Sequence, residues 1–144
     1  MNPKAQGEKG QRIAIGELAK WDIDVAIPLT DNLPWDFIIA YKNKLLRVQV
    51  KSGKRKGRGI EGSIEFGLTT SNWHRKTTKK YSIVECDLML LCDYDSLYVL
   101  GPQDFEGRRS FNIRKNPSRN KQVKGVNLHD DYVFSIERLD KLLA

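Results

Sequence analysis

The stretch Pro34-Trp35-Asp36-Phe37-Ile38-Ile39-Ala40, followed after a short turn by Leu45-Leu46-Arg47-Val48-Gln49-Val50-Lys51, decides the fold of this chain. Both halves are mainly apolar, with several β-branched residues, and Lys42-Asn43 between them is a turn signal, so the sequence predicts a β-hairpin over residues 35–51. A two-residue loop between Tyr41 and Lys44 would set Asp36 opposite Gln49. A register two residues longer would set Asp36 opposite Lys51.

Either register gives the hairpin one polar face and one apolar face, because side chains alternate along a strand and opposed residues share a face. The polar face carries Asp36, Gln49 and Lys51. The apolar face, which we expect to enter the core, carries Phe37, Ile39, Val48 and Val50.

The polar face has the groups that a phosphodiesterase needs. Hydrolysis of a phosphodiester requires an activated water and a stabilised charge on the phosphate, and a hard cation such as Mg²⁺, held by oxygen ligands, provides both. Asp36 offers a carboxylate, Gln49 an amide oxygen and Val50 a backbone carbonyl, while Lys51 would be a cation beside the attacking water. Glu8, early in a helix predicted over residues 5–21, is the candidate for a second carboxylate. The alternative is that Asp36 and Lys51 are ordinary solvated residues at strand ends.

The positive charge of the chain is concentrated in two segments. The formal net charge is +7, yet residues 51–58 hold five basic residues and residues 107–127 hold seven, with no acidic residue in either. Such confinement is typical of a surface that binds a nucleic-acid backbone, whereas a solvated basic loop kept for solubility is the plainer alternative.

The same residues resemble the motif of the PD-(D/E)xK nuclease superfamily, in which a Pro-Asp pair and an acid-x-Lys triplet lie on one hairpin. Pro34-Trp35-Asp36 and Gln49-Val50-Lys51 carry it, with Trp35 inserted and Gln49 in place of the usual acid. The longer pattern Gly7-Glu8, Asp24-Val25-Ala26-Ile27-Pro28-Leu29, Asp36-Phe37-Ile38-Ile39 and Arg47-Val48-Gln49-Val50-Lys51-Ser52-Gly53 resembles the homing endonucleases of this superfamily that cyanobacterial group I introns encode. The resemblance spans roughly residues 6–100.

The resemblance implies an α/β fold with a restriction-endonuclease-like core, a mixed β-sheet flanked by helices in the order αβββαβ. It also implies Mg²⁺ as cofactor, catalytic roles for Asp36, Gln49, Lys51 and Glu8, and a homotetramer that cuts a long pseudo-palindromic duplex site. Because Gln49 is neutral, full activity would depend on Glu8.

The remaining pattern predicts one domain over residues 1–144, since this length suits a single core. Residues 24–29, 60–68, 87–92 and 97–100 read as strands, residues 133–143 as a helix, and residues 72–80 as a helix capped by Ser71-Asn72. Segments 51–58 and 60–68 could pair as a ribbon that fits the DNA major groove. Cys86 and Cys92 are expected to be buried free thiols, and Tyr81 to pack in the core or at a hinge. Neither a signal peptide nor an apolar run of about 20 residues is evident, so we expect a cytoplasmic, nucleoid-associated bacterial protein.

The basic segments supply the candidate DNA contacts, with Arg suited to guanine and Asn to adenine. The candidates are Lys54, Arg55, Lys56, Arg58, Ser71, Asn72, Arg75, Arg108, Arg109, Asn112, Arg114, Asn116, Arg119, Lys121 and Lys124. Residues 107–127 could instead be a disordered basic loop that orders on DNA.

Three functions remain open. The first is a Mg²⁺-dependent endonuclease on double-stranded DNA, intron-encoded and acting as a homo-oligomer, a dimer if not a tetramer, because a duplex has two strands to cut. The second is a Holliday-junction resolvase. The third is a non-catalytic DNA- or RNA-binding module on a nuclease-like scaffold.

Overall fold

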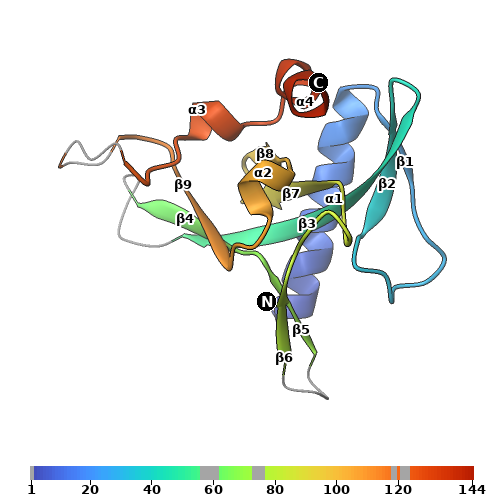
Figure 1. Ribbon diagram of the computed structural model, residues 1–144, viewed down its shortest axis with the longest axis horizontal. Helices are drawn as coiled ribbons and strands as arrows, with labels where there is room; N and C mark the ends of the chain where they lie inside the picture. The colour runs from blue at the N-terminus through green and yellow to red at the C-terminus, as the bar shows by residue number, and fades with distance from the viewer. Residues whose placement is uncertain (1, 56–61, 73–76, 118–119, 121–123) are drawn as a thin grey trace.

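The computed structural model describes residues 2–55, 62–72, 77–117, 120 and 124–144. Its elements are α1 (Pro3–Lys20), β1 (Asp24–Ala26), β2 (Phe37–Tyr41), β3 (Lys44–Arg55), β4 (Ser63–Gly67), β5 (Thr69–Asn72), β6 (Thr77–Lys80), β7 (Leu88–Cys92), β8 (Leu97–Leu100), α2 (Pro102–Phe105), β9 (Ser110–Arg114), α3 (His129–Tyr132) and α4 (Ile136–Leu143). Figure 1 shows a twisted sheet with the long helix α1 against one side and α4 near the end of that helix.

The predicted hairpin forms with the shorter of the two registers. Tyr41 pairs with Lys44 and Phe37 with Val48, so β2 and β3 are joined by a two-residue turn. The turn residues Lys42 and Asn43 both have positive φ angles, of 46° and 65°. These are the values that a type I′ hairpin turn requires, which explains why an asparagine stands in it.

Strand β3 is the centre of the sheet because it pairs with three others. Its first half is antiparallel to β2, its middle is parallel to β7 from Val48 to Ser52, and its end is antiparallel to β4 from Gly53 to Arg55. β1 and β8 extend the sheet at the outer sides of β2 and β7, and β9 pairs with β4. The predicted mixed α/β sheet is confirmed. Segments 51–58 and 60–68 pair in their described part as predicted, but β9 adds a third strand, so the ribbon has three strands where the sequence predicted two.

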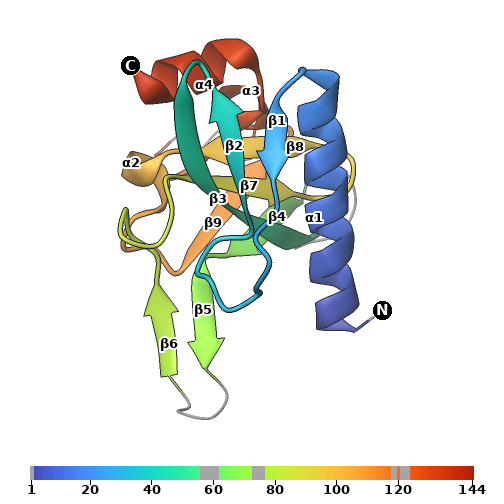
Figure 2. The same ribbon diagram turned by 90° about the vertical axis from the view of Figure 1, so that its right-hand side faces the viewer.

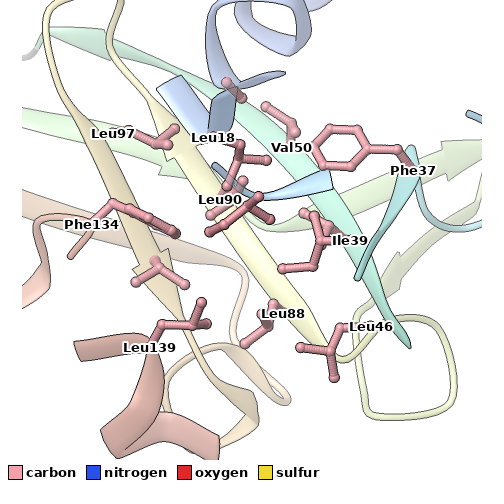
Figure 3. Close-up of a cluster of buried hydrophobic side chains, with 14 of the residues drawn as sticks. Leu18, Phe37, Ile39, Leu46, Val50, Leu88, Leu90, Leu97, Phe134 and Leu139 are labelled. Carbon is pink, nitrogen blue, oxygen red and sulfur yellow. The ribbon is translucent and has the colours of Figure 1, made fainter. Parts of the chain in front are cut away.

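Two apolar clusters lie on opposite sides of this sheet. The first joins α1 and α4 to the even-numbered residues of β3, and Figure 3 shows its side chains converging, among them Leu18, Val50, Leu90 and Leu139. The second contains Phe66, Tyr81, Met89, Leu91 and Phe111, from β4, the chain after β6, β7 and β9. Leu139 is fully buried and its neighbours Ile136, Leu142 and Leu143 pack on the first cluster, so the apolar stripe of the last helix belongs to the core.

Helix α1 begins with a strong capping signal and ends close to its predicted end. The Asn2 side chain accepts a hydrogen bond from the Ala5 N–H at 2.8 Å, and Pro3 occupies the first turn. Gly10, Ala14 and Leu18 form its buried face. Gly10 allows the close approach to β3, since a Cβ there would collide with the Ser52 hydroxyl.

Three sequence-based expectations need correction. The helix expected over residues 72–80 is wrong, because residues 77–80 form strand β6, paired with β5 in a separate two-stranded sheet. Thr69, Thr70, Thr77 and Thr78 favour a strand through their β-branched side chains, which outweighs the capping signal at Ser71-Asn72. Figure 2 shows this hairpin extending away from the main sheet.

The other two corrections concern strand limits. β1 ends at Ala26, short of the predicted residue 29, since Pro28 has no N–H to donate. Residues 107–127, expected as a loop, contain β9. Cys86 and Cys92 are buried and free, as expected. Among the described residues, no helix has the length and apolar character needed to cross a bilayer.

Candidate active site

Asp36 lies just before β2, where that strand parts from β3. Its backbone N–H donates to the Val48 carbonyl at 2.8 Å, and its carboxylate Oδ2 accepts the Val50 N–H at 2.7 Å. The side chain thus replaces the β2 backbone as the partner of β3 at this point. The hydrogen bonds hold the carboxylate at the edge of the sheet.

Gln49 and Val50 place two further oxygens near Asp36. In a strand the N–H and C=O of one residue point the same way, so the Val50 carbonyl is directed to the side where its N–H meets Asp36. The Gln49 amide nitrogen donates to that same carbonyl at 3.2 Å, which leaves the amide oxygen as the atom that could ligate a cation. The structure therefore brings together the carboxylate, the amide and the carbonyl that the sequence indicated.

Lys51 is on the same face of β3, but its ammonium is not in open solvent. Its Nζ donates to the Thr69 carbonyl at 3.0 Å and lies 4.9 Å from the centre of the Tyr81 ring. Neither Thr69 nor Tyr81 was among the predicted site residues. Tyr81 was expected to be core, and it is only 4% exposed.

Burial opposes the charge on both central groups. Desolvation raises the pKa of the Asp36 carboxyl, against the lowering by the Val50 N–H and the Lys51 ammonium. Desolvation also lowers the pKa of Lys51, and the charge of Asp36 partly offsets it. Asp36 and Lys51 are thus close enough to interact electrostatically. Because their surroundings are partly dehydrated, each would interact strongly with a bound cation or phosphate.

For Glu8 the structure describes no contact with these groups. Glu8 is exposed on α1, whereas the α1 residue that lines a pocket with Asp36 is Gln11, one helical turn further on. The pocket has a volume of about 430 Å³ and is otherwise formed by the chain from Ile27 to Trp35. Helical periodicity links Glu8 to Gln11, so this residue could have been found from the sequence by extending the candidate face by one turn.

The donors fit a hard divalent cation of modest affinity. In the part of the chain that the structure describes, no group of three or more His, Cys, Asp and Glu side chains could hold a metal ion. Asp36 is the charged donor beside the Val50 carbonyl and the Gln49 amide, and the pocket that it lines also contains Gln11 and a second carboxylate, Asp31. All five groups offer an oxygen, as Mg²⁺ prefers, and three of them are neutral.

The predicted DNA-contacting residues divide into three groups. Arg108, Arg109, Asn112, Asn116 and Lys124 are exposed, and Arg114 is half-buried at the end of β9. Lys54 and Arg55 end β3, and Ser71 and Asn72 end β5, as far as the backbone is described. Lys56, Arg58, Arg75, Arg119 and Lys121 lie outside the described residues.

Strand β9 gives the second basic segment a fixed place beside the first. β4 pairs with both β3 and β9, so Lys54, Glu65 and Asn112 occupy one row across the ribbon. Phe111 and Ile113 of β9 are buried, and the alternate residues Ser110 and Asn112 are exposed. Two basic segments that are far apart in the sequence thus lie on either side of β4, and Figure 1 shows β4 beside β9.

Comparison with known proteins defines the class of this protein. The sequence matches the family model of PD-(D/E)XK endonucleases over residues 1–135. The fold resembles that of a bacterial homing endonuclease, I-Ssp6803I, with a TM-score of 0.73 at 20% sequence identity, covering 99% of this chain and 94% of that one. The structure of MepB gives a TM-score of only 0.37 at 10% identity, covering 79% of this chain and 85% of that one. No curated protein matches the chain in sequence.

These findings place the protein among the nucleases. The chain belongs to the PD-(D/E)XK endonuclease family, because the family model covers nearly its whole length. The fold class and the nuclease function predicted from the motif are therefore confirmed.

Proposed function

We propose that this protein is a site-specific endonuclease that hydrolyses double-stranded DNA with Mg²⁺, and that it acts as an intron-encoded homing enzyme. The observation that carries the proposal is the meeting of Asp36, the Gln49 amide and the Val50 carbonyl just before the start of β2, with Lys51 close by. The likeness in fold to a homing endonuclease supports the choice of substrate.

Each residue has a distinct part in this proposal. Asp36, Gln49 and Val50 would hold the divalent cation, whose chemistry is to stabilise negative charge on the phosphate. Lys51 would hold a water or a phosphate oxygen through its remaining N–H groups. Burial favours the neutral carboxyl, but a cation beside Asp36 favours the ionised form that binds it.

Glu8 and Gln11 are rival candidates for the contribution of α1. Glu8 has the charge, whereas Gln11 lines the pocket that contains Asp36. We propose Glu8 as the second carboxylate ligand of Mg²⁺. Because Glu8 is exposed, we expect the site to bind Mg²⁺ with low affinity. Glu8→Gln should then raise the Mg²⁺ concentration needed for half-maximal cleavage. If only Gln11→Ala raises it, the pocket residue has that role.

The basic segments would bind the DNA backbone. We propose contacts by the exposed Arg108 and Arg109 and by the Arg and Lys residues of segment 51–58. If about six phosphates are contacted, a plot of log K against log salt should have a slope near −5. We also propose a symmetric homo-oligomer, since two strands must be cut; a mass measurement in solution would show it.

One sequencing experiment tests the proposal. The protein is incubated with Mg²⁺, a diverse duplex library and a spiked four-way junction, and the new DNA ends are sequenced, with Asp36→Ala and EDTA as controls. The proposal predicts cuts at one long duplex site, absent in both controls. Cuts confined to the junction would mean a resolvase, and binding without cleavage would mean a binding module with a lost active site.

A further inference from the structure

Lys51 is held by a part of the chain that the nuclease motif does not include. Its ammonium donates to the carbonyl of Thr69, the first residue of β5, and lies over the ring of Tyr81, which follows β6. Both contacts come from the two ends of the β5–β6 hairpin, which forms its own two-stranded sheet. The motif supplies the lysine, and the hairpin supplies the surroundings that fix its position.

Tyr81 is rigidly placed. Its ring is buried in the second apolar cluster with Met89 and Leu91 of β7, the strand beside Lys51. Its carbonyl accepts the Gly107 N–H at 3.2 Å. A second anchor follows directly, since the carboxylate of the buried Glu85 accepts the Ser82 N–H at 2.8 Å and the Ser82 hydroxyl at 2.6 Å.

Glu85 also ties the base of the hairpin to this anchor. Its other oxygen lies 2.7 Å from Lys79 Nζ of β6, so one carboxylate contacts both the strand before Tyr81 and the turn after it. None of these contacts involves Lys51.

A lysine needs such support more than most catalytic groups do. Its flexible four-carbon stem loses rotamer freedom when it is fixed in one place, and its ammonium has three N–H donors that can rotate. In this protein the Thr69 carbonyl accepts one hydrogen bond from the Lys51 ammonium, and the face of the Tyr81 ring makes a cation–π contact with it. The ammonium is left with donors to direct toward the Asp36 end of the site, whose charge it feels.

We propose that Tyr81 is a positioning residue for the nuclease reaction: its ring face, together with the Thr69 carbonyl, holds the Lys51 ammonium beside Asp36. The inference rests on the proposed function. Tyr81 touches neither substrate nor cation in this scheme and acts only through Lys51. Its hydroxyl interacts with Thr70 of the hairpin and is not needed for the ring contact.

The test distinguishes the effect of the Tyr81 ring from the effects of its hydroxyl and of apolar packing. Tyr81→Phe keeps the ring face, and Tyr81→Leu removes it while keeping an apolar side chain. Tyr132→Leu is the matched control, because Tyr132 packs on the same apolar cluster and has the Arg138 guanidinium 4.9 Å above its ring, the same distance as Lys51 over Tyr81.

Single-turnover cleavage of the duplex site and DNA affinity are measured for each protein. We expect Tyr81→Leu to cut roughly tenfold more slowly with unchanged DNA affinity, and Tyr81→Phe and Tyr132→Leu to cut close to the wild-type rate. NMR gives a readout that does not depend on cleavage: in the wild type, the ε-methylene protons of Lys51 should be shifted upfield by the ring, and comparison with the folded Lys51→Met variant assigns them.

The outcomes distinguish the two proposals. Unshifted Lys51 protons would overturn the inference, as would wild-type cleavage by Tyr81→Leu. An equal loss in Tyr132→Leu would also overturn it, since packing alone would then explain the effect. If the wild type cuts no DNA at all, the proposed function fails first, and the positioning role fails with it.

Discussion

The two faces of β3 lead to different environments. Val48 and Val50 point into the cluster under α1 and α4, where their neighbours are apolar. Gln49 and Lys51 point to the other side, where Lys51 meets a backbone carbonyl and an aromatic ring at the border of the second cluster. Neighbouring residues of β3 thus have different roles: one face stabilises the fold, and the other carries the groups proposed for catalysis. Substitutions on the apolar face should therefore change stability, and those on the polar face should change the cleavage rate.

The largest effect is expected on the polar face. Lys51→Met keeps the length of the side chain and removes the charge that would hold water or phosphate. We expect the single-turnover cleavage rate to fall by about 10³-fold, with little change in melting temperature, because an ammonium in a partly buried place is replaced by an apolar group.

The control is Lys44→Met at the other end of the same strand, where Lys44 contacts only the Leu143 carbonyl at 3.4 Å among the contacts described. It should cut at the wild-type rate. Equal losses in both variants would mean that Lys51 acts through general charge and has no specific place in the site.

The opposite result is expected on the apolar face. Val48 is fully buried, so Val48→Ala removes two methyl groups from the core and should lower the free energy of unfolding by about 2 kcal/mol. Chemical denaturation measures this. The cleavage rate of the folded protein should stay the same; a large loss of rate at a temperature where the variant is fully folded would contradict the division between the two faces.

A pH-dependent effect is expected at Glu85, which anchors the β5–β6 hairpin. The ion pair with Lys79 and the hydrogen bonds from Ser82 lower the pKa of Glu85 to about 2, from its usual 4.5. The folded protein therefore binds this proton less readily than the unfolded chain, and the stabilisation is present above pH 4.5 and is lost as the pH falls toward 2.

Glu85→Gln should remove that part of the acid dependence of stability and destabilise the protein at neutral pH. Unfolding curves at several pH values measure both changes. Curves for the variant and the wild type that stay parallel from pH 7 to pH 3 would show that Glu85 has an ordinary pKa.

The smallest effects concern the approach of α1 to β3. Gly10→Ala places a methyl group against the Ser52 hydroxyl, and we expect a net loss of about 1 kcal/mol after the gain in helix propensity. Gly7→Ala meets no atom within 4 Å and should stabilise by up to about 1 kcal/mol. Thermal melting compares them. Adding Ser52→Ala should rescue Gly10→Ala, and failure of that rescue would place the strain elsewhere.

The parts of the fold that were predicted depend on local periodicity. The division of Asp36, Gln49 and Lys51 from Phe37 and Val48 follows from a period of two, whichever of the two predicted registers the hairpin takes. The buried run of β7 and the helical stripe of α4 were also predicted, but the spacing does not tell whether that stripe packs in the core or against another subunit.

The rest depends on contacts that are distant in sequence. The prediction of a helix over residues 72–80 was wrong because four threonines and the pairing of β6 with β5 outweighed a capping signal. The contact of Lys51 with Thr69 spans 18 positions, and no spacing in the sequence indicates it. Gln11 was not predicted for a different reason: the sequence indicates a metal ligand through charge, which Glu8 has and Gln11 lacks, whereas Gln11 lines the pocket with Asp36.

The most direct test of the account is the cleavage rate of Asp36→Asn under single-turnover conditions with Mg²⁺ and saturating DNA. The amide keeps the size of the side chain and an oxygen for the Val50 N–H, while the charge and one acceptor oxygen are lost. Asp24→Asn, an exposed position on β1, is the matched control. We predict a loss of about 10³-fold or more for Asp36→Asn with unchanged DNA affinity, and the wild-type rate for Asp24→Asn. Cleavage by Asp36→Asn at the wild-type rate would contradict the assignment of this site.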